Sequence, residues 1–294
     1  MKRNEKILFI FMMIFFGIVL MCVFLQGFMK YREKREKKRE SLENKTKNEN
    51  KTKNENQRLW ALSFGGGDKN YHDAVNRIQT EMENADIFYE IVIKTDADLK
   101  DDSEFWGQHQ TFIETNKRGY GYWLWKPYLI MKTMENMKDN DILFYVDSGC
   151  ELPKEKKTAT QIEDMVKRCN QNTILYTFSA YDEKLYNKMD LVVDLNANNH
   201  STMNSLQNAA TLLAIKKTDL TSEFVKDWYT TCCNYHYIDD TQSVIDNDPE
   251  FVEHRHDQSV FSLLIKSDKY KSVMNTPTNP MDGLPFIMSR KRHG

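Results

Sequence analysis

The sequence is poor in cysteine, and its few cysteines follow no spaced pattern. Its five cysteines include one adjacent pair, Cys232 and Cys233, but no Cys-x-x-Cys pair. Zinc sites and thioredoxin-like redox sites depend on such spaced pairs. The sequence therefore indicates neither kind of site, and it does not require disulfide bonds.

Basic charge is also scarce in most of the chain. Residues 58–294 contain 27 Lys and Arg against 36 Asp and Glu, whereas residues 1–57 contain 14 against 7. Nucleic-acid binding normally needs a basic face that neutralises phosphates. The acidic balance of residues 58–294 therefore argues against a nucleic-acid partner.

The N-terminal region carries a long apolar run. Residues 7–29 contain no charged residue and are rich in Phe, Met, Ile and Leu, and at about 1.5 Å per residue they can span a hydrocarbon core of about 30 Å. A cleaved signal peptide is the alternative, but its apolar core is usually about 7–15 residues long and ends in small residues. We predict a tail at 1–6 and a single transmembrane anchor at 7–29.

A polar segment follows the predicted anchor. The hexapeptide Glu-Asn-Lys-Thr-Lys-Asn occurs twice in tandem, at 43–48 and 49–54. Such a repeat has no apolar surface to bury, so we expect residues 30–57 to form a disordered stem. Residues 58–294 are long enough for one large catalytic domain with a well-developed core.

Two patterns predict opposite orientations of this single-pass membrane protein. Seven Lys and Arg between Lys30 and Arg39 outnumber the three before the anchor, which favours a cytosolic domain by the positive-inside rule. Acceptor patterns for N-glycosylation at Asn44, Asn50 and Asn199 favour a lumenal domain. The predicted location is an endomembrane of the ER or Golgi type, or a plasma or viral-factory membrane, with both orientations open.

The most informative motif lies at 141–151. An apolar run there ends in Asp147, a Ser-Gly turn and Glu151, which is the pattern of a buried strand that carries a carboxylate at its C-terminal end. Open α/β sheets bind ligands at that end of their strands. A simple capping role at the turn is the alternative for Asp147.

The segments around this strand alternate between extended and helical patterns, which predicts an α/β fold with a mostly parallel sheet flanked by helices. The predicted strands lie at 59–64, 87–93, 173–178 and 211–215. The predicted helices begin after Asp68 and lie at 104–116, 127–137, 164–170 and 218–228. A last helix has Asp257 in its first turn, where capping of the helix is the alternative role for this residue.

Two segments hold candidate ligand-binding residues. Gly65 and Gly66 follow the first predicted strand, where glycines let a nucleotide approach the backbone, although their spacing matches neither a Rossmann motif nor a P-loop. In 118–128, taken as extended, Trp123 and Trp125 share one face and either stack on a base or sugar or fill the core.

Four ordered motifs resemble nucleotide-sugar-dependent glycosyltransferases of the GT-A fold, in particular a group from polysaccharide synthesis. They are Ser-Phe-Gly-Gly-Gly at 63–67, Arg-Gly-Tyr-Gly-Tyr-Trp-Leu-Trp-Lys-Pro at 118–127, Tyr-Val-Asp-Ser-Gly-Cys at 145–150 and Arg-His-Asp-Gln-Ser at 255–259. The resemblance implies a Rossmann-like GT-A domain that moves a sugar from a nucleoside-diphosphate sugar to a glycan, glycolipid or glycoprotein. By analogy alone, the donor is a UDP-sugar.

The resemblance also implies roles for single residues. Asp257 and Asp147 are the catalytic candidates, and Asp257 either deprotonates an acceptor hydroxyl in an inverting reaction or binds the donor sugar in a retaining one. Asp257 and Gln258 lie on the acceptor side. The donor side comprises Ser63, Gly65, Gly66, Arg118, Trp123, Trp125, Lys126 and Asp147.

The chain departs from the family pattern at Gly149, where the usual motif has a second metal-binding Asp. We predict Mn²⁺ or Mg²⁺ held by Asp147, Glu151 and His256. Direct neutralisation of the diphosphate by Arg118 and Lys126 is the alternative.

Two other hypotheses stay open. One is a metal-dependent hydrolase that uses Asp147, His254, His256 and Asp257, although the sequence shows no second spaced ligand cluster. The other is a non-catalytic glycan-binding protein that keeps the GT-A fold, which the missing second Asp makes worth considering.

Overall fold

The computed structural model describes residues 57–271 and 284–291. The predicted tail, the predicted anchor and nearly all of the predicted stem lie outside the described residues. Within the described ranges, no helix is long and apolar enough to cross a membrane.

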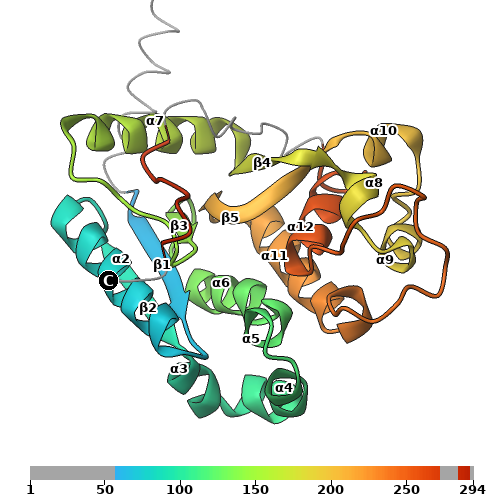
Figure 1. The fold of residues 1–294 in the computed structure, drawn as a ribbon. Coiled ribbons are helices and arrows are strands. Elements are labelled where there is room, and N and C mark those ends of the chain that lie inside the picture. Colours follow the sequence, from blue (N-terminus) through green and yellow to red (C-terminus); the bar gives the residue numbers. More distant parts are fainter. Residues whose placement is uncertain (1–56, 272–283, 292–294) are drawn as a thin grey trace, which may run out of the picture. The chain divides into compact units, whose positions relative to one another are not determined.

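A five-stranded sheet carries the fold, with the strand order β2-β1-β3-β5-β4 (Figure 1). β1 pairs in parallel with β2 and β3, whereas β5 runs antiparallel to β3 and β4. Four of the five strands therefore point the same way, as predicted. The strands are β1 (Leu59–Gly65), β2 (Glu90–Thr95), β3 (Ile142–Val146), β4 (Ile174–Asp182) and β5 (Leu206–Lys216).

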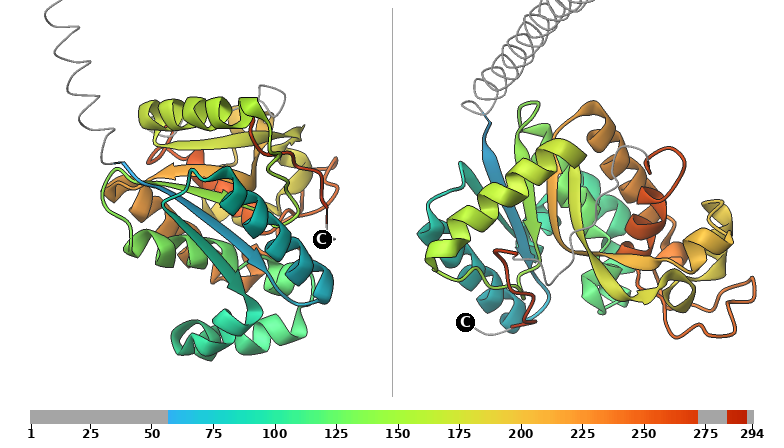
Figure 2. Two further views of the ribbon diagram at one scale, coloured as in Figure 1. Left: turned by 90° about the vertical axis from the view of Figure 1, so that its left-hand side faces the viewer. Right: turned by 90° about the horizontal axis from the view of Figure 1, so that it is seen from above.

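Helices cover both faces of this sheet (Figure 2). The longer ones are α2 (Lys69–Ala85), α4 (Ser103–Thr115), α6 (Trp125–Glu135), α7 (Lys156–Asn172), α11 (Asp219–Cys232) and α12 (Asp257–Ile265). The short ones are α3 (Asp96–Asp101), α5 (Gly119–Tyr122), α8 (Glu183–Tyr186), α9 (Met189–Asp194), α10 (His200–Met203) and the 3-10 turn η1 (Tyr235–Tyr237).

The core is divided between the two faces of the sheet. Leu143 and Tyr145 of β3 pack in one cluster with α6, α11 and α12, whereas Ile142, Phe144 and Val146 pack in another with α2 and α7. Successive side chains of a strand point to opposite faces. Because both faces are covered, β3 is apolar along its whole length, which is why its sequence predicted a buried strand.

The prediction of an extended segment before α6 is wrong. Residues 119–123 all have positive φ values, between 52° and 84°, and form a left-handed turn. Such a backbone costs a non-glycine residue about 1–2 kcal/mol, and Gly119 and Gly121 reduce that cost. Trp123 and Trp125 therefore do not share a face of a strand, because Trp123 ends the turn and Trp125 begins α6.

Candidate active site

Asp147 lies at the C-terminal end of β3, as predicted. Its N–H donates to the Thr211 carbonyl of β5 (2.9 Å), and its Oδ1 atom accepts from the Tyr145 hydroxyl (2.5 Å). The side chain is nevertheless 29% exposed. One carboxylate oxygen is thus fixed by the protein, while the group as a whole remains accessible to a ligand.

Lys126 connects Asp147 to the start of α12. Its Nζ atom lies 3.4 Å from Asp147 Oδ1, 3.2 Å from Asp257 Oδ2 and 3.2 Å from the Ala210 carbonyl. Of these three contacts, the one with the Ala210 carbonyl is a hydrogen bond, and the two with the carboxylates are ion pairs. Lys126 therefore holds the two carboxylates together by its charge.

The group formed by Asp147, Lys126 and Asp257 contains two acids but one base. Burial raises the pKa of Asp257 to about 6; the Lys126 ammonium opposes this rise and the Asp147 charge adds to it. Burial alone would lower the pKa of Lys126, but the two carboxylates outweigh it and raise that pKa. Lys126 is therefore charged at neutral pH, and the group carries excess negative charge.

The backbone that carries Asp257 is held from two sides. The indole N–H of Trp228 in α11 donates to the Asp257 carbonyl (2.9 Å). The preceding residue, His256, has φ 57° and ψ −128°, a conformation that side-chain-bearing residues rarely adopt. Its ring stacks against Tyr122 (4.9 Å between centroids) and Trp123 (5.3 Å). The left-handed turn thus supports the start of α12.

Gln258 completes the hydrogen bonding of β5. Where β3 has ended, the N–H groups of β5 need other acceptors. The Gln258 Oε1 atom accepts from Ala210 N–H (3.2 Å), and Ser262 Oγ accepts from Asn208 N–H (2.7 Å). The Gln258 amide also donates to Gln207 Oε1 (2.7 Å). Both ends of the Gln258 amide are thus engaged by the protein, and its contact with a sugar stays a prediction.

The predicted metal ligands do not converge. Glu151 pairs with Lys291 (3.0 Å) and bridges to Ile287, and the Nδ1 atom of His256 donates to the Ile238 carbonyl (2.7 Å). Across residues 57–271 and 284–291, no three His, Cys, Asp or Glu side chains are grouped to hold a metal ion. The set of Asp147, Glu151 and His256 therefore does not fit as predicted, and dependence on Mn²⁺ or Mg²⁺ stays a prediction.

The residues predicted near β1 have structural contacts. The buried Ser63 hydroxyl donates to the Val146 carbonyl (2.7 Å) and ties β1 to β3. A Cβ atom on Gly65 would lie 2.2 Å from the Tyr71 carbonyl, and one on Gly66 would lie 2.7 Å from the Phe64 ring. The close approach of α2 and of Phe64 thus explains these glycines without a ligand.

The cation and the tryptophans of the second motif also have partners. Arg118 is 43% exposed and lies 3.0 Å from Asp240 and 3.3 Å from Glu253. Trp125 is buried, and its ring stacks on Phe64 at 4.0 Å, so it fills the core. Trp123 is partly buried against His256. The donor-side roles of these residues stay predictions.

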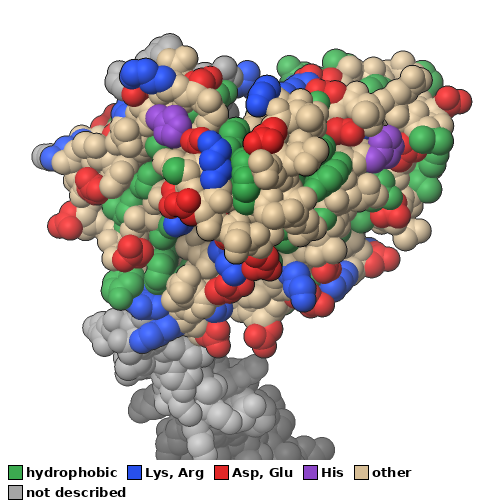
Figure 3. All heavy atoms as spheres, turned by 90° about the horizontal axis from the view of Figure 1, so that it is seen from below, with side chains coloured by type: hydrophobic (Ala, Val, Ile, Leu, Met, Phe, Trp, Pro, Cys, Tyr) green, Lys and Arg blue, Asp and Glu red, His purple; other side chains and the backbone are tan. Residues whose placement is uncertain are grey.

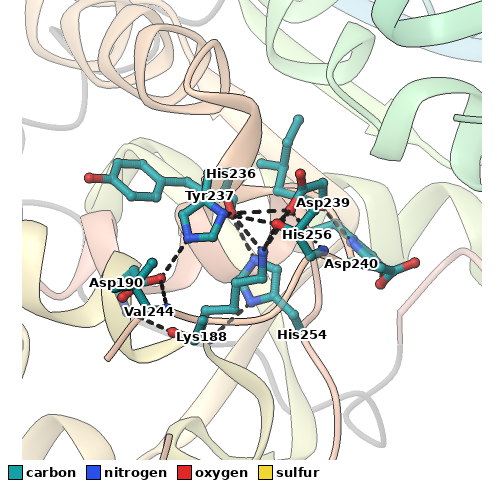
Figure 4. A network of polar contacts seen from close by, with 12 residues as sticks. Lys188, Asp190, His236, Tyr237, Asp239, Asp240, Val244, His254 and His256 are labelled. Carbon is teal, nitrogen blue, oxygen red and sulfur yellow. Dashed lines mark hydrogen bonds and ion pairs between the residues drawn. The ribbon is translucent and has the colours of Figure 1, made fainter. Parts of the chain in front are cut away.

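We call the polar network of Lys188, Asp190, His236 and Asp239 the clasp, and it is drawn in Figure 4. His254 lies against this clasp. Its Nδ1 atom accepts from Lys188 N–H (3.1 Å), and its Nε2 atom donates to a backbone carbonyl (2.8 Å). Burial lowers the pKa of His254 to about 3. The hydrolase hypothesis therefore finds no free nitrogen on this imidazole.

The clasp fixes the loop that precedes α12. Lys188 Nζ lies 2.6 Å from Asp239, and Asp190 accepts from His236 Nε2 (2.6 Å). Asp190 also accepts from the N–H groups of Val244 (2.7 Å) and of its neighbour. These contacts hold the loop against α9, and the loop leads directly to Asp257.

Sequence reasoning missed two residues that support Asp147. Arg77 of α2 donates from Nη2 to the carbonyls of Ser148 (2.9 Å) and Cys150 (3.0 Å), which fixes the turn after β3. Tyr145 bonds Asp147 directly. The period of two along a strand places Tyr145 and Asp147 on one face, so the sequence held a signal for Tyr145. Arg77 lies on a distant helix and had no such signal.

The described surface carries mixed charge. Figure 3 shows acidic and basic side chains interspersed over one face, with apolar side chains between them. The absence of a nucleic-acid partner stays a prediction from the acidic composition.

No family model matches the sequence, and neither does any curated protein. Solved glycosyltransferases are similar in structure. Mouse xyloside xylosyltransferase 1 in its apo form is 10% identical, with a TM-score of 0.39 over 70% of this chain and 81% of that one. The galactosyltransferase LgtC in complex with donor and acceptor sugar analogs is 14% identical, with a TM-score of 0.33 over 69% and 70%. An active-site mutant of LgtC is 15% identical, with a TM-score of 0.35 over 69% of each chain. Similarities this distant establish neither the family nor the reaction.

Proposed function

We propose that this chain is a glycosyltransferase that moves a sugar from a nucleoside-diphosphate sugar, with a UDP-sugar as the first candidate, to a glycan, glycolipid or glycoprotein. One observation carries the proposal. Two carboxylates, Asp147 and Asp257, share a single ammonium at the C-terminal end of a parallel strand, where open α/β sheets bind ligands.

Asp257 is suited to accept a proton. Its pKa of about 6 leaves it ionised at neutral pH yet more basic than an ordinary carboxylate. Its Oδ2 atom accepts no hydrogen bond from the described residues and lies 3.2 Å from the Lys126 ammonium. In the proposed reaction, the acceptor hydroxyl loses its proton to Asp257 and its oxygen bonds to the anomeric carbon. The bond from that carbon to the diphosphate breaks, and the nucleoside diphosphate leaves with the electron pair.

Lys126 positions the two acids in this proposal. Its ammonium is hydrogen-bonded to the Ala210 carbonyl and paired with both carboxylates, so its charge is already balanced by the protein. By lowering the pKa of Asp257, it also keeps the base ionised at neutral pH. The more exposed Asp147 is left to contact the donor.

The proposal includes attachment to a membrane through residues 7–29, which rests on the apolar run in the sequence. A role in polysaccharide synthesis rests on the four motifs that resemble that group. Both statements are independent of the active-site geometry.

The test uses the full chain with a panel of UDP-, GDP- and CMP-sugars and measures release of the nucleotide. We expect release from one donor, and a loss of about 100-fold or more in Asp147→Asn. Asp139→Asn removes an exposed carboxylate elsewhere and serves as the matched control. No release from any donor, with no donor-dependent thermal shift, would favour the glycan-binding or hydrolase hypothesis.

A further inference from the structure

A departing diphosphate requires positive charge, but the cations around the proposed site are already neutralised. Each one lies against at least one carboxylate of the protein: Lys126 against Asp147 and Asp257, Arg118 against Asp240 and Glu253, Arg77 against Glu81, and Lys291 against Glu151. The predicted three-residue metal site does not fit either, because its ligands do not converge in the described residues. The charge must come from another group.

Arg290 is a cation of a different kind. It is exposed, and no carboxylate or carbonyl in residues 57–271 and 284–291 pairs with its guanidinium. Its backbone has a φ of 54°, which costs a non-glycine residue energy. Strained residues of this kind gather at ligand-binding sites.

Arg290 lies over the turn that carries Asp147. The segment from Leu284, dark red in Figure 1, bridges to the turn through Ile287 and Glu151. Lys291 N–H donates to the Gly149 carbonyl (2.9 Å). A Cβ atom on Gly149 would lie 3.3 Å from the Arg290 Cα atom.

This packing favours glycine at position 149. A Cβ atom there would lie closer to the Arg290 Cα atom than is usual, so the segment would have to move slightly. The chain has no second acid there and instead brings to the same turn a guanidinium that pairs with no carboxylate or carbonyl of the described residues. Arginine suits this task because its planar fork binds phosphate oxygens in pairs, and its long stem lets the charge reach past its own backbone.

We propose that Arg290 binds the diphosphate of the donor, in place of a metal ion held by Asp147, Glu151 and His256. This inference rests on the proposed function, because it assumes a nucleoside-diphosphate ligand. It assigns the diphosphate to the side of the turn covered by residues 284–291.

The experiment measures binding to the full chain by calorimetry in EDTA, with UDP and GDP as the diphosphates and uridine and guanosine as the matched nucleosides. We expect Arg290→Gln to weaken binding of the preferred diphosphate about 10- to 100-fold and to leave binding of its nucleoside unchanged. Arg290→Lys should retain part of the affinity. Arg168→Gln removes the same charge from α7 and should bind like the wild type.

The outcomes separate this inference from the function on which it rests. Wild-type affinity in Arg290→Gln would overturn the role of Arg290 while leaving the glycosyltransferase proposal intact. Binding of the diphosphate only after Mn²⁺ is added would assign the charge to a metal and overturn the inference. Equal weakening of nucleoside and diphosphate would show that the variant disturbs the segment and that the charge is not the cause. A wild-type chain that binds neither UDP nor GDP would overturn both proposals.

Discussion

Lys126 and Lys188, both buried in the described part of the chain, differ in the charges that surround them. Lys126 is 3% exposed and Lys188 is 2% exposed, and each has three oxygen acceptors within reach. Lys188 contacts one carboxylate, that of Asp239, with a carbonyl and a hydroxyl. Lys126 contacts two carboxylates and a carbonyl.

The ion pair of Lys188 with Asp239 stabilises the fold, whereas the ion pairs of Lys126 leave Asp257 able to accept a proton. In the clasp, burial alone would raise the pKa of Asp239, but hydrogen bonds from Lys188 and Thr241 outweigh it and lower that pKa. In the proposed site, burial raises the pKa of Asp257 and the single ammonium does not reverse it. A carboxylate whose pKa moves toward neutrality costs stability, and such groups gather at active sites.

Asp257→Asn should produce the largest effect on activity. Loss of the proton acceptor should reduce nucleotide release about 100- to 10,000-fold. The folded state holds this proton up to about pH 6, above the ordinary carboxyl pKa, so the charge lowers stability as pH rises through that window. The variant should therefore raise the free energy of unfolding at pH 8, on the order of 1–3 kcal/mol. A variant that is less stable and fully active would contradict this contrast between the two lysines.

Asp239→Asn should act in the opposite direction. The lowered pKa of Asp239 means that its charge stabilises the fold above the ordinary carboxyl pKa, and this stability is lost as pH falls through the folded-state value. Leaving Lys188 without its carboxylate should reduce the free energy of unfolding by about 3–5 kcal/mol. Denaturant unfolding at pH 7 measures this, and transfer per folded molecule should persist. A loss of activity without a loss of stability would place the clasp in the reaction.

Lys126→Met should shift the pH dependence of transfer. Lys126 lowers the pKa of Asp257, so its removal should raise that pKa and move the acid limb of kcat/KM to higher pH. Once the pKa of Asp257 exceeds 7, each further increase of that pKa by one unit reduces activity at pH 7 about tenfold. Lys188→Met is the matched control, since it should destabilise the fold and leave the acid limb in place. An unchanged acid limb in Lys126→Met would show that the ammonium does not tune Asp257.

Glu151→Gln should have the smallest effect. Glu151 is 28% exposed and pairs with Lys291 near the surface, and such pairs contribute little to stability. Nucleotide release, and its response to EDTA, should stay close to those of the wild type. A strong loss of activity that added Mn²⁺ reverses would instead make Glu151 a metal ligand, as its sequence position suggested.

Local patterns predicted the scaffold of the site well. The apolar run before Asp147 identified a strand buried on both faces, and the predicted strand and helix alternation is present. Most ends are shifted by a few residues, but α7 begins at Lys156, well before the predicted start at 164. The prediction failed at Trp123 and Trp125, where the chain forms a left-handed turn. That turn is supported by contacts with His256, which lies more than 130 residues away in sequence. Local sequence patterns cannot predict a contact between residues so far apart.

By itself, the sequence determined that Asp147 ends a buried strand and that Asp257 begins a helix, because the periodicity of apolar residues specifies strands and helices over short stretches. Only the tertiary structure decided which charges meet. Lys126 joins two acids from distant segments, Glu151 is taken by Lys291, and the segment at Arg290 covers Gly149. These pairings depend on how the segments pack. The sequence around a charged residue does not indicate which distant residue it will contact.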